Sequence, residues 1–193
     1  TADLYHSLEA ETGQATGFKQ NGSISVAKTL ARLEELQRGA SMGKTFGLRI
    51  DELTPGEIKE RWPLLEVGDV VGGIFLPGDG QTNPIDTTQA LAKGARQRGA
   101  KIFENTKVER IRVAQGRAVG VDTESGFIAA DTVVLCAGMW SHRMAEDIGV
   151  AVPLHAAEHF YIVTEPIDGL PGNLPVLRVQ DECAYYKEDA GKL

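Results

Sequence analysis

The stretch Thr132–Ser141, TVVLCAGMWS, is the part of the sequence that decides the fold. Its apolar run Thr132–Ala137 predicts a strand that is buried on both faces, which is typical of a parallel sheet. Ala137 and Gly138 end this strand without a bulky side chain, so a ligand can approach the backbone closely. Ligands of α/β sheets collect at the carboxyl ends of strands, where a diphosphate would fit. A strand that simply turns at a glycine has the same sequence, and both interpretations stay open for this motif alone.

The residues upstream of this strand predict a helix and then a β-meander. Asn83 can cap a helix with Pro84 at its first position, and Gly99 can end it. We expect its apolar face to consist of Ile85, Leu91, Ala92 and Ala95. Short β-prone runs follow at Lys101–Glu104, Lys107–Val113, Ala118–Thr123 and Phe127–Ala130. Turns around Gly116 and Gly126 separate the last three runs, which predict the meander.

Further elements are expected on both sides of this block. A helix that ends near Gly13 opens the chain. Another helix begins at Thr54, which can form a capping box with Glu57, while Pro55 takes the first helical position. We also expect a helix over about Ala27–Arg38 that ends at Gly39, and one over Ser141–Val150. The remaining strands are expected at Ser23–Val26, Val70–Phe75, His159–Thr164, Val176–Val179 and Cys183–Lys187.

Composition excludes several classes of protein. The chain has 193 residues, of which 42% are hydrophobic, and its net charge of −7 is too small for a disordered chain of this composition. No run approaches the roughly 18 consecutive apolar residues of a membrane span. With 20 Lys and Arg against 27 Asp and Glu, the chain is not expected to bind nucleic acid. Neither Cys136 nor Cys183 has a second Cys or a His at metal-ligand spacing, so we expect no metal site.

Several stretches, taken in order, cover nearly the whole chain and resemble one enzyme family. They are Glu11–Phe18, Leu76–Pro84, Ala90–Ala95, Gly99–Glu104, Gly116–Val121, Ala137–Ser141 and His159–Glu165. Together they resemble the FAD-dependent amine oxidoreductases of the D-amino-acid oxidase superfamily. Within it, the sequence looks most like the dimethylglycine and sarcosine dehydrogenase or oxidase group.

The resemblance implies an α/β fold built from parts of two domains. One is a partial FAD/NAD(P)-binding-type domain with a β-meander, expected at residues 81–140. The other is a substrate domain with a mixed, largely antiparallel sheet, expected at residues 1–80 and 141–193. In this family a Gly-x-Gly-x-x-Gly turn and a flavin-linking His come before these segments. We therefore expect a middle fragment that does not hold FAD tightly on its own.

The resemblance also implies residues that contact the cofactor. Val108 lies where the family has a valine whose backbone meets the adenine. Ala137 and Gly138 match the end of the strand under the diphosphate, and Trp140 matches the aromatic residue beside it. An apolar meander residue at Val108 and a packing Trp140 are the alternatives.

His159 and Tyr185 match the segments that supply the active-site His and Tyr in dimethylglycine oxidase-like enzymes. A neutral imidazole and a phenol can position an amine and accept or share its proton. The alternatives are a strand His that faces solvent and an ordinary aromatic residue in a sheet. Tyr186 and Tyr161 are rivals to Tyr185. Side chains alternate along a strand, so Tyr185 and Tyr186 cannot both face the same ligand. Arg178 is a candidate for binding a substrate carboxylate, and the alternative is an arginine of a strand that faces solvent.

The expected function is oxidation of the N-methyl C–N bond of dimethylglycine or sarcosine, by hydride transfer to flavin N5. The expected cofactor is FAD, and the longer relatives add a module for tetrahydrofolate. The expected partners are a small N-methylated amino acid and the remaining parts of the same protein, in the bacterial cytoplasm or the mitochondrial matrix. Two alternatives stay open: a non-catalytic regulatory relative, and another oxidase of the superfamily such as a glycine or glycerol-phosphate oxidase.

Overall fold

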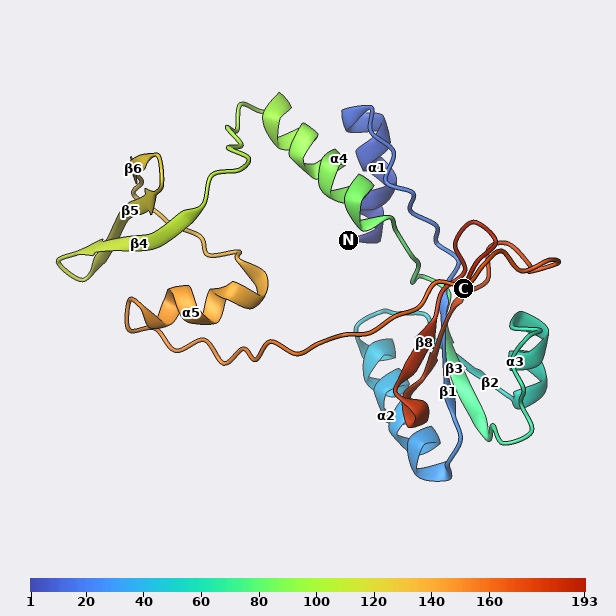
Figure 1. Ribbon diagram of the computed structural model, residues 1–193. Coiled ribbons are helices and arrows are strands. Elements are labelled where there is room, and N and C mark those ends of the chain that lie inside the picture. Colours follow the sequence, from blue (N-terminus) through green and yellow to red (C-terminus); the bar gives the residue numbers. More distant parts are fainter. The chain divides into compact units, whose positions relative to one another are not determined.

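The computed structural model describes residues 1–193 as two compact units (Figure 1). The first unit comprises residues 1–100 and 162–193, and the second comprises residues 101–161. The first contains a five-stranded mixed sheet and the second a three-stranded antiparallel sheet, so the α/β fold class is confirmed. No helix of the structure has both the length and the apolar character that crossing a membrane requires.

The sheet of the first unit has the strand order β2-β3-β1-β7-β8. Its strands are β1 (Ser23–Ala27), β2 (Asp51–Leu53), β3 (Gly72–Leu76), β7 (Val176–Val179) and β8 (Ala184–Tyr186). The only parallel pair in the sheet is β1 with β7, and the other neighbours are antiparallel. The expected mixed, largely antiparallel sheet is therefore present.

Helices α2 (Leu30–Thr45) and α3 (Pro55–Arg61) pack on the two faces of this sheet. Ile74 contacts the α2 side and its neighbour Phe75 belongs to the cluster on the α3 side, as strand alternation requires. The larger cluster holds the largest fully buried side chains of the chain, which are Ile24, Val26, Ile58 and Leu177. Each such side chain contributes roughly 1.5–3 kcal/mol by leaving water.

The predicted helix starts at Thr54 and Asn83 are both confirmed. Thr54 and Glu57 form the complete capping box of α3, and that helix ends at Arg61 before Trp62. Asn83 accepts hydrogen bonds from the N–H groups of Ile85 and Asp86 at the start of α4 (Pro84–Gln97). The prediction for α2 was wrong at both ends, since the helix starts at Leu30 and runs through Gly39 to Thr45.

Helix α4 packs against α1 (Ala2–Thr12), but not through the expected apolar face. Its buried residues are Thr87, Ala90 and Gly94, whereas Ile85 is 70% exposed. A Cβ on Gly94 would lie 3.2 Å from Thr12 Cγ2. Small residues therefore decide this contact, because they let the two helix backbones approach, and a hydrophobic pattern does not report them.

The meander of the second unit is confirmed in the order β4-β5-β6. Its strands are β4 (Val108–Ala114), β5 (Arg117–Thr123) and β6 (Gly126–Ala129). Gln115 and Gly116 both have positive φ, as a tight hairpin turn requires. After the meander come a 3₁₀ turn, η1 (Gly138–Trp140), and the short helix α5 (Ser141–Glu146), which ends before the expected Val150.

Three predicted strands were wrong: Lys101–Glu104, Thr132–Ala137 and His159–Thr164 have no strand structure. A strand needs hydrogen-bonded neighbours, and none of these runs pairs with another strand of the described chain. Nor is Thr132–Ala137 buried on both faces, because Val134 is 77% exposed. These three runs do have a β-prone composition, but strand pairing depends on the tertiary structure, which composition does not report.

Gly73 in β3 should not tolerate a side chain. A Cβ there would lie 2.5 Å from the carbonyl oxygen of Ser25 on β1 and 3.1 Å from Ile58 Cδ1. We expect Gly73→Ala to lower the free energy of unfolding by about 3 kcal/mol in urea denaturation. The matched control is Gly39→Ala in α2, where no atom opposes the new methyl group, and it should raise stability by up to about 1 kcal/mol. Equal effects of the two substitutions would contradict this account.

Candidate functional site

The hairpin of β7 and β8 carries the predicted tyrosine and arginine on one face. Arg178 lies directly opposite Tyr185 in the register, and Leu177 lies opposite Tyr186. Side chains alternate along a strand, so Tyr185 shares a face with Arg178 and Tyr186 shares the other face with Leu177. The two tyrosines accordingly line different cavities.

The cavity on the Tyr185 face is an open hollow of about 460 Å³. It is lined by Val176, Arg178, Gln180, Cys183, Ala184 and Tyr185. Arg178 is exposed, forms no ion pair and is the only charged residue of this lining. The Oε1 atom of Gln180 is buried and accepts no hydrogen bond. The hollow therefore offers a cation, Arg178, which suits a ligand that has an anionic group.

Contacts with β1 and α2 hold the turn of this hairpin. The turn contains the 3₁₀ segment η2 (Gln180–Glu182). Asp181 accepts hydrogen bonds from the backbone N–H of Lys28 at 2.9 Å and from Arg32 Nε at 3.1 Å. The Lys28 N–H is the main cause that lowers the pKa of Asp181, and Arg32 adds to it. These contacts fix where Gln180 and Cys183 stand at the edge of the hollow.

The structure places the two predicted catalytic residues in different units. Tyr185 lies in β8 of the first unit and is 55% exposed. His159 lies in the second unit, in an exposed segment without regular structure. The joint action of these two residues stays a prediction.

The four residues predicted to contact FAD all lie in the second unit. Val108 begins β4 and is 38% exposed, and Trp140 is 67% exposed at the end of η1. Ala137 precedes η1, and Gly138 has a φ of 55° with no atom within 4 Å of the position that a Cβ would occupy. The open backbone at Gly138 fits close approach by a bulky group such as a diphosphate. The assignment of these residues to FAD stays a prediction.

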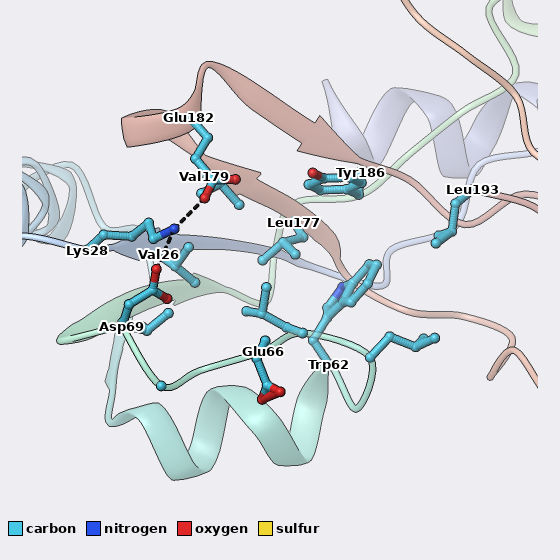
Figure 2. Close-up of a pocket in the computed structure, with 14 residues that line it drawn as sticks. Val26, Lys28, Trp62, Glu66, Asp69, Leu177, Val179, Glu182, Tyr186 and Leu193 are labelled. Carbon is cyan, nitrogen blue, oxygen red and sulfur yellow. Dashed lines mark hydrogen bonds and ion pairs between the residues drawn. The ribbon is translucent and has the colours of Figure 1, made fainter.

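A second cavity, of about 480 Å³, lies on the Tyr186 face of the hairpin (Figure 2). Its walls include Val26, Trp62, Leu177 and Tyr186, while Lys28, Asp69 and Glu182 lie on one side. The sequence pattern does not predict this cavity. Strand alternation already separated Tyr186 from Tyr185, but nothing in the sequence pairs Tyr186 with Trp62, which is 124 positions earlier.

Comparison with known proteins gives one family for the whole chain. A family model described as "FAD dependent oxidoreductase" (DAO) matches residues 1–193. Two similar curated proteins are 4-methylaminobutanoate oxidase (formaldehyde-forming) of Paenarthrobacter nicotinovorans, 39% identical over 99% of this chain, and human mitochondrial sarcosine dehydrogenase, 40% identical over 93%. The mitochondrial pyruvate dehydrogenase phosphatase regulatory subunit of Mus musculus is 37% identical over 97%.

This chain spans 23%, 20% and 22% of the lengths of these three relatives. The predicted resemblance to the sarcosine and dimethylglycine dehydrogenase group is confirmed.

Solved structures agree on the fold. L-proline dehydrogenase from P. horikoshii matches 99% of this chain with a TM-score of 0.82 and 25% identity, and glycine oxidase from Geobacillus kaustophilus matches 98% with 0.78 and 27%. This chain covers 51% and 50% of those two chains.

Proposed function

Because this chain belongs to the family of FAD-dependent oxidoreductases, we propose that it forms the substrate-binding part of an amine-oxidising enzyme. The substrate class that we propose is a small N-methylated amino acid, with sarcosine and dimethylglycine as the candidates. The similarity to sarcosine dehydrogenase and to 4-methylaminobutanoate oxidase supports this class. The reaction would oxidise the N-methyl C–N bond.

The observation that carries this proposal is the hollow beside Tyr185 and Arg178. An amino-acid substrate has a carboxylate and an amine a few bonds apart. Arg178 is a cation without a partner and would bind the carboxylate by a charge-assisted hydrogen bond. The phenol of Tyr185 would then accept a hydrogen bond from the N–H of sarcosine or of protonated dimethylglycine.

The residues of this chain would also control the proton of the amine. When FAD is bound, it supplies the acceptor for the hydride at flavin N5. An amine can release this hydride only while its lone pair is free, so the ammonium form must first lose a proton. We assign this proton to His159 and Tyr185, since a neutral imidazole can accept it and a phenol can share it.

We assign the contacts with FAD to Val108, Ala137, Gly138 and Trp140, of which Ala137 is half-buried and the other three are exposed. Other parts of a longer protein would complete the cofactor site, because 4-methylaminobutanoate oxidase and sarcosine dehydrogenase are four to five times as long as this chain. The product would be an iminium, which is hydrolysed or passed to tetrahydrofolate in another module. Relatives are both bacterial and mitochondrial, which supports the bacterial cytoplasm or the mitochondrial matrix as its location.

A second candidate is a regulatory protein without catalysis. The 37% identity to the pyruvate dehydrogenase phosphatase regulatory subunit favours it, because that relative matches nearly the whole chain. A similar fold does not fix function, so the site must decide. A third candidate, a glycine or glycerol-phosphate oxidase, is supported by the similarity to glycine oxidases.

Anaerobic reduction of the flavin-loaded protein that carries this chain would separate the candidates. We expect sarcosine or dimethylglycine to bleach the visible absorbance of the flavin, and glycerol phosphate to leave it unchanged, because it has no amine. Reduction by glycine alone or by glycerol phosphate would support the third candidate. If none of these compounds reduces the flavin, catalysis on this substrate class is refuted and the regulatory candidate is favoured.

The two adjacent tyrosines give a matched test of the proposed catalytic face. Tyr185→Phe should lower kcat by about 100-fold, the scale of losing one group that shares a proton in the transition state. Tyr186→Phe removes the same hydroxyl group from the other face of the hairpin and should leave kcat within about twofold. Steady-state assays measure kcat of both variants, and stopped-flow spectroscopy measures the rate at which the substrate reduces the flavin. A larger loss of kcat in Tyr186→Phe than in Tyr185→Phe would contradict the assignment of the catalytic residues to the Tyr185 face of the sheet.

Arg178 should decide whether the substrate must carry a carboxylate. Arg178→Met should raise KM for sarcosine by about 30-fold, the scale of one lost hydrogen bond to a charged group, and should change kcat less. Binding of dimethylamine, which has no carboxylate, should not weaken in this variant. The control is Arg38→Met in α2, which removes a cation from a pair with Glu34. If sarcosine and dimethylamine are affected equally, Arg178 does not bind the carboxylate.

A further inference from the structure

The cavity on the Tyr186 face has no part in the proposed reaction, since Tyr186 and Tyr185 point to opposite faces of the sheet. Its volume of about 480 Å³ lies in the range of cavities that hold small organic molecules. Most of its lining is apolar, including Val70, Leu177 and Val179. A ligand that fits here must therefore have a hydrocarbon or aromatic body.

Two aromatic rings form part of the cavity wall. The rings of Trp62 and Tyr186 have centroids 6.4 Å apart and are tilted by 57°. Trp62 is held in place because its Nε1 donates a hydrogen bond of 2.7 Å to the carbonyl oxygen of Pro175. Trp62 is only 3% exposed, whereas Tyr186 is 39% exposed, so Tyr186 presents the accessible π face. Such a face attracts organic cations.

The charged residues of the lining determine whether the cavity favours a cation or an anion. The lining contains three carboxylates, from Glu66, Asp69 and Glu182, but only one cation, Lys28, and Lys59 outside the lining lies 3.9 Å from Glu66. Lys28 Nζ is 2.6 Å from Asp69 and also pairs with Glu182. The hydrogen bond to Asp69 raises the pKa of Lys28 most, and the one to Glu182 adds to it, so Lys28 stays charged. The net charge of the lining is therefore negative, which repels anions and attracts cations. The hollow around Arg178 has the opposite sign.

We propose that this cavity binds an organic ammonium ion that has an aromatic or branched hydrocarbon body and no carboxylate. The body would fill the space between Leu177, Trp62 and Tyr186, and the cationic head would lie over the ring of Tyr186, attracted by the excess of carboxylates over cations in the lining. The other face of the hairpin would take amino acids through Arg178. This proposal does not rest on the proposed reaction, because binding is measured without turnover.

The test uses benzyltrimethylammonium as the probe and phenylacetate as an anion of similar size. Isothermal titration calorimetry measures binding to the flavin-loaded protein that carries this chain. We expect saturable binding of benzyltrimethylammonium with a dissociation constant on the order of 1 mM and a stoichiometry of one, and no binding of phenylacetate.

Matched variants assign the binding to this cavity. Tyr186→Leu keeps the apolar contact but removes the π face, and it should weaken binding roughly fivefold. Tyr185→Leu on the opposite face should leave binding unchanged. Asp69→Asn combined with Glu182→Gln should weaken binding at least tenfold, and circular dichroism checks that each variant is folded. The absence of saturable binding, equal binding of phenylacetate, or equal effects of the two tyrosine variants would overturn the proposal.

Discussion

The parallel pairing of β1 with β7 is the contact on which the first unit depends. It joins Ser23–Val26 to Val176–Val179, which are about 150 positions apart in the chain. Without it, β7 and β8 would have no sheet to extend, and the cavity beside Trp62 would lose the wall between Val26 and Leu177. The pairing is held by a shared apolar face, since Ile24, Val26, Leu177 and Val179 are all at most 4% exposed. The hydrophobic effect thus fixes the position of the residues to which we assign chemistry.

Much of this arrangement could be predicted from the sequence, because local physics decides it. The capping box at Thr54 and the cap at Asn83 depend on residues within one turn of the helix. The meander follows from β-prone runs of suitable length around two glycine turns. The separation of Tyr185 from Tyr186 needs only the alternation of side chains along a strand.

Other features could not be predicted, because they depend on which segments meet. The runs Lys101–Glu104 and Thr132–Ala137 have strand composition but no pairing neighbour in this chain. The contact of α1 with α4 depends on the small residues Ala90 and Gly94, which a hydrophobic pattern cannot single out. The cavity beside Trp62 exists because β7 returns to β1, so the sequence gives no sign of it.

The register of the β7–β8 hairpin also determines which chemistry each cavity can have. Leu177 and Val179 must stay in the core, so Arg178 between them must face the other side. Asp181, held by Lys28 and Arg32, fixes the turn, and β8 then pairs so that Tyr185 lies opposite Arg178. A shift of one residue would exchange Tyr185 and Tyr186 between a cationic hollow and a cavity with a negative lining. The same core packing that stabilises the sheet therefore keeps two binding surfaces of opposite charge apart.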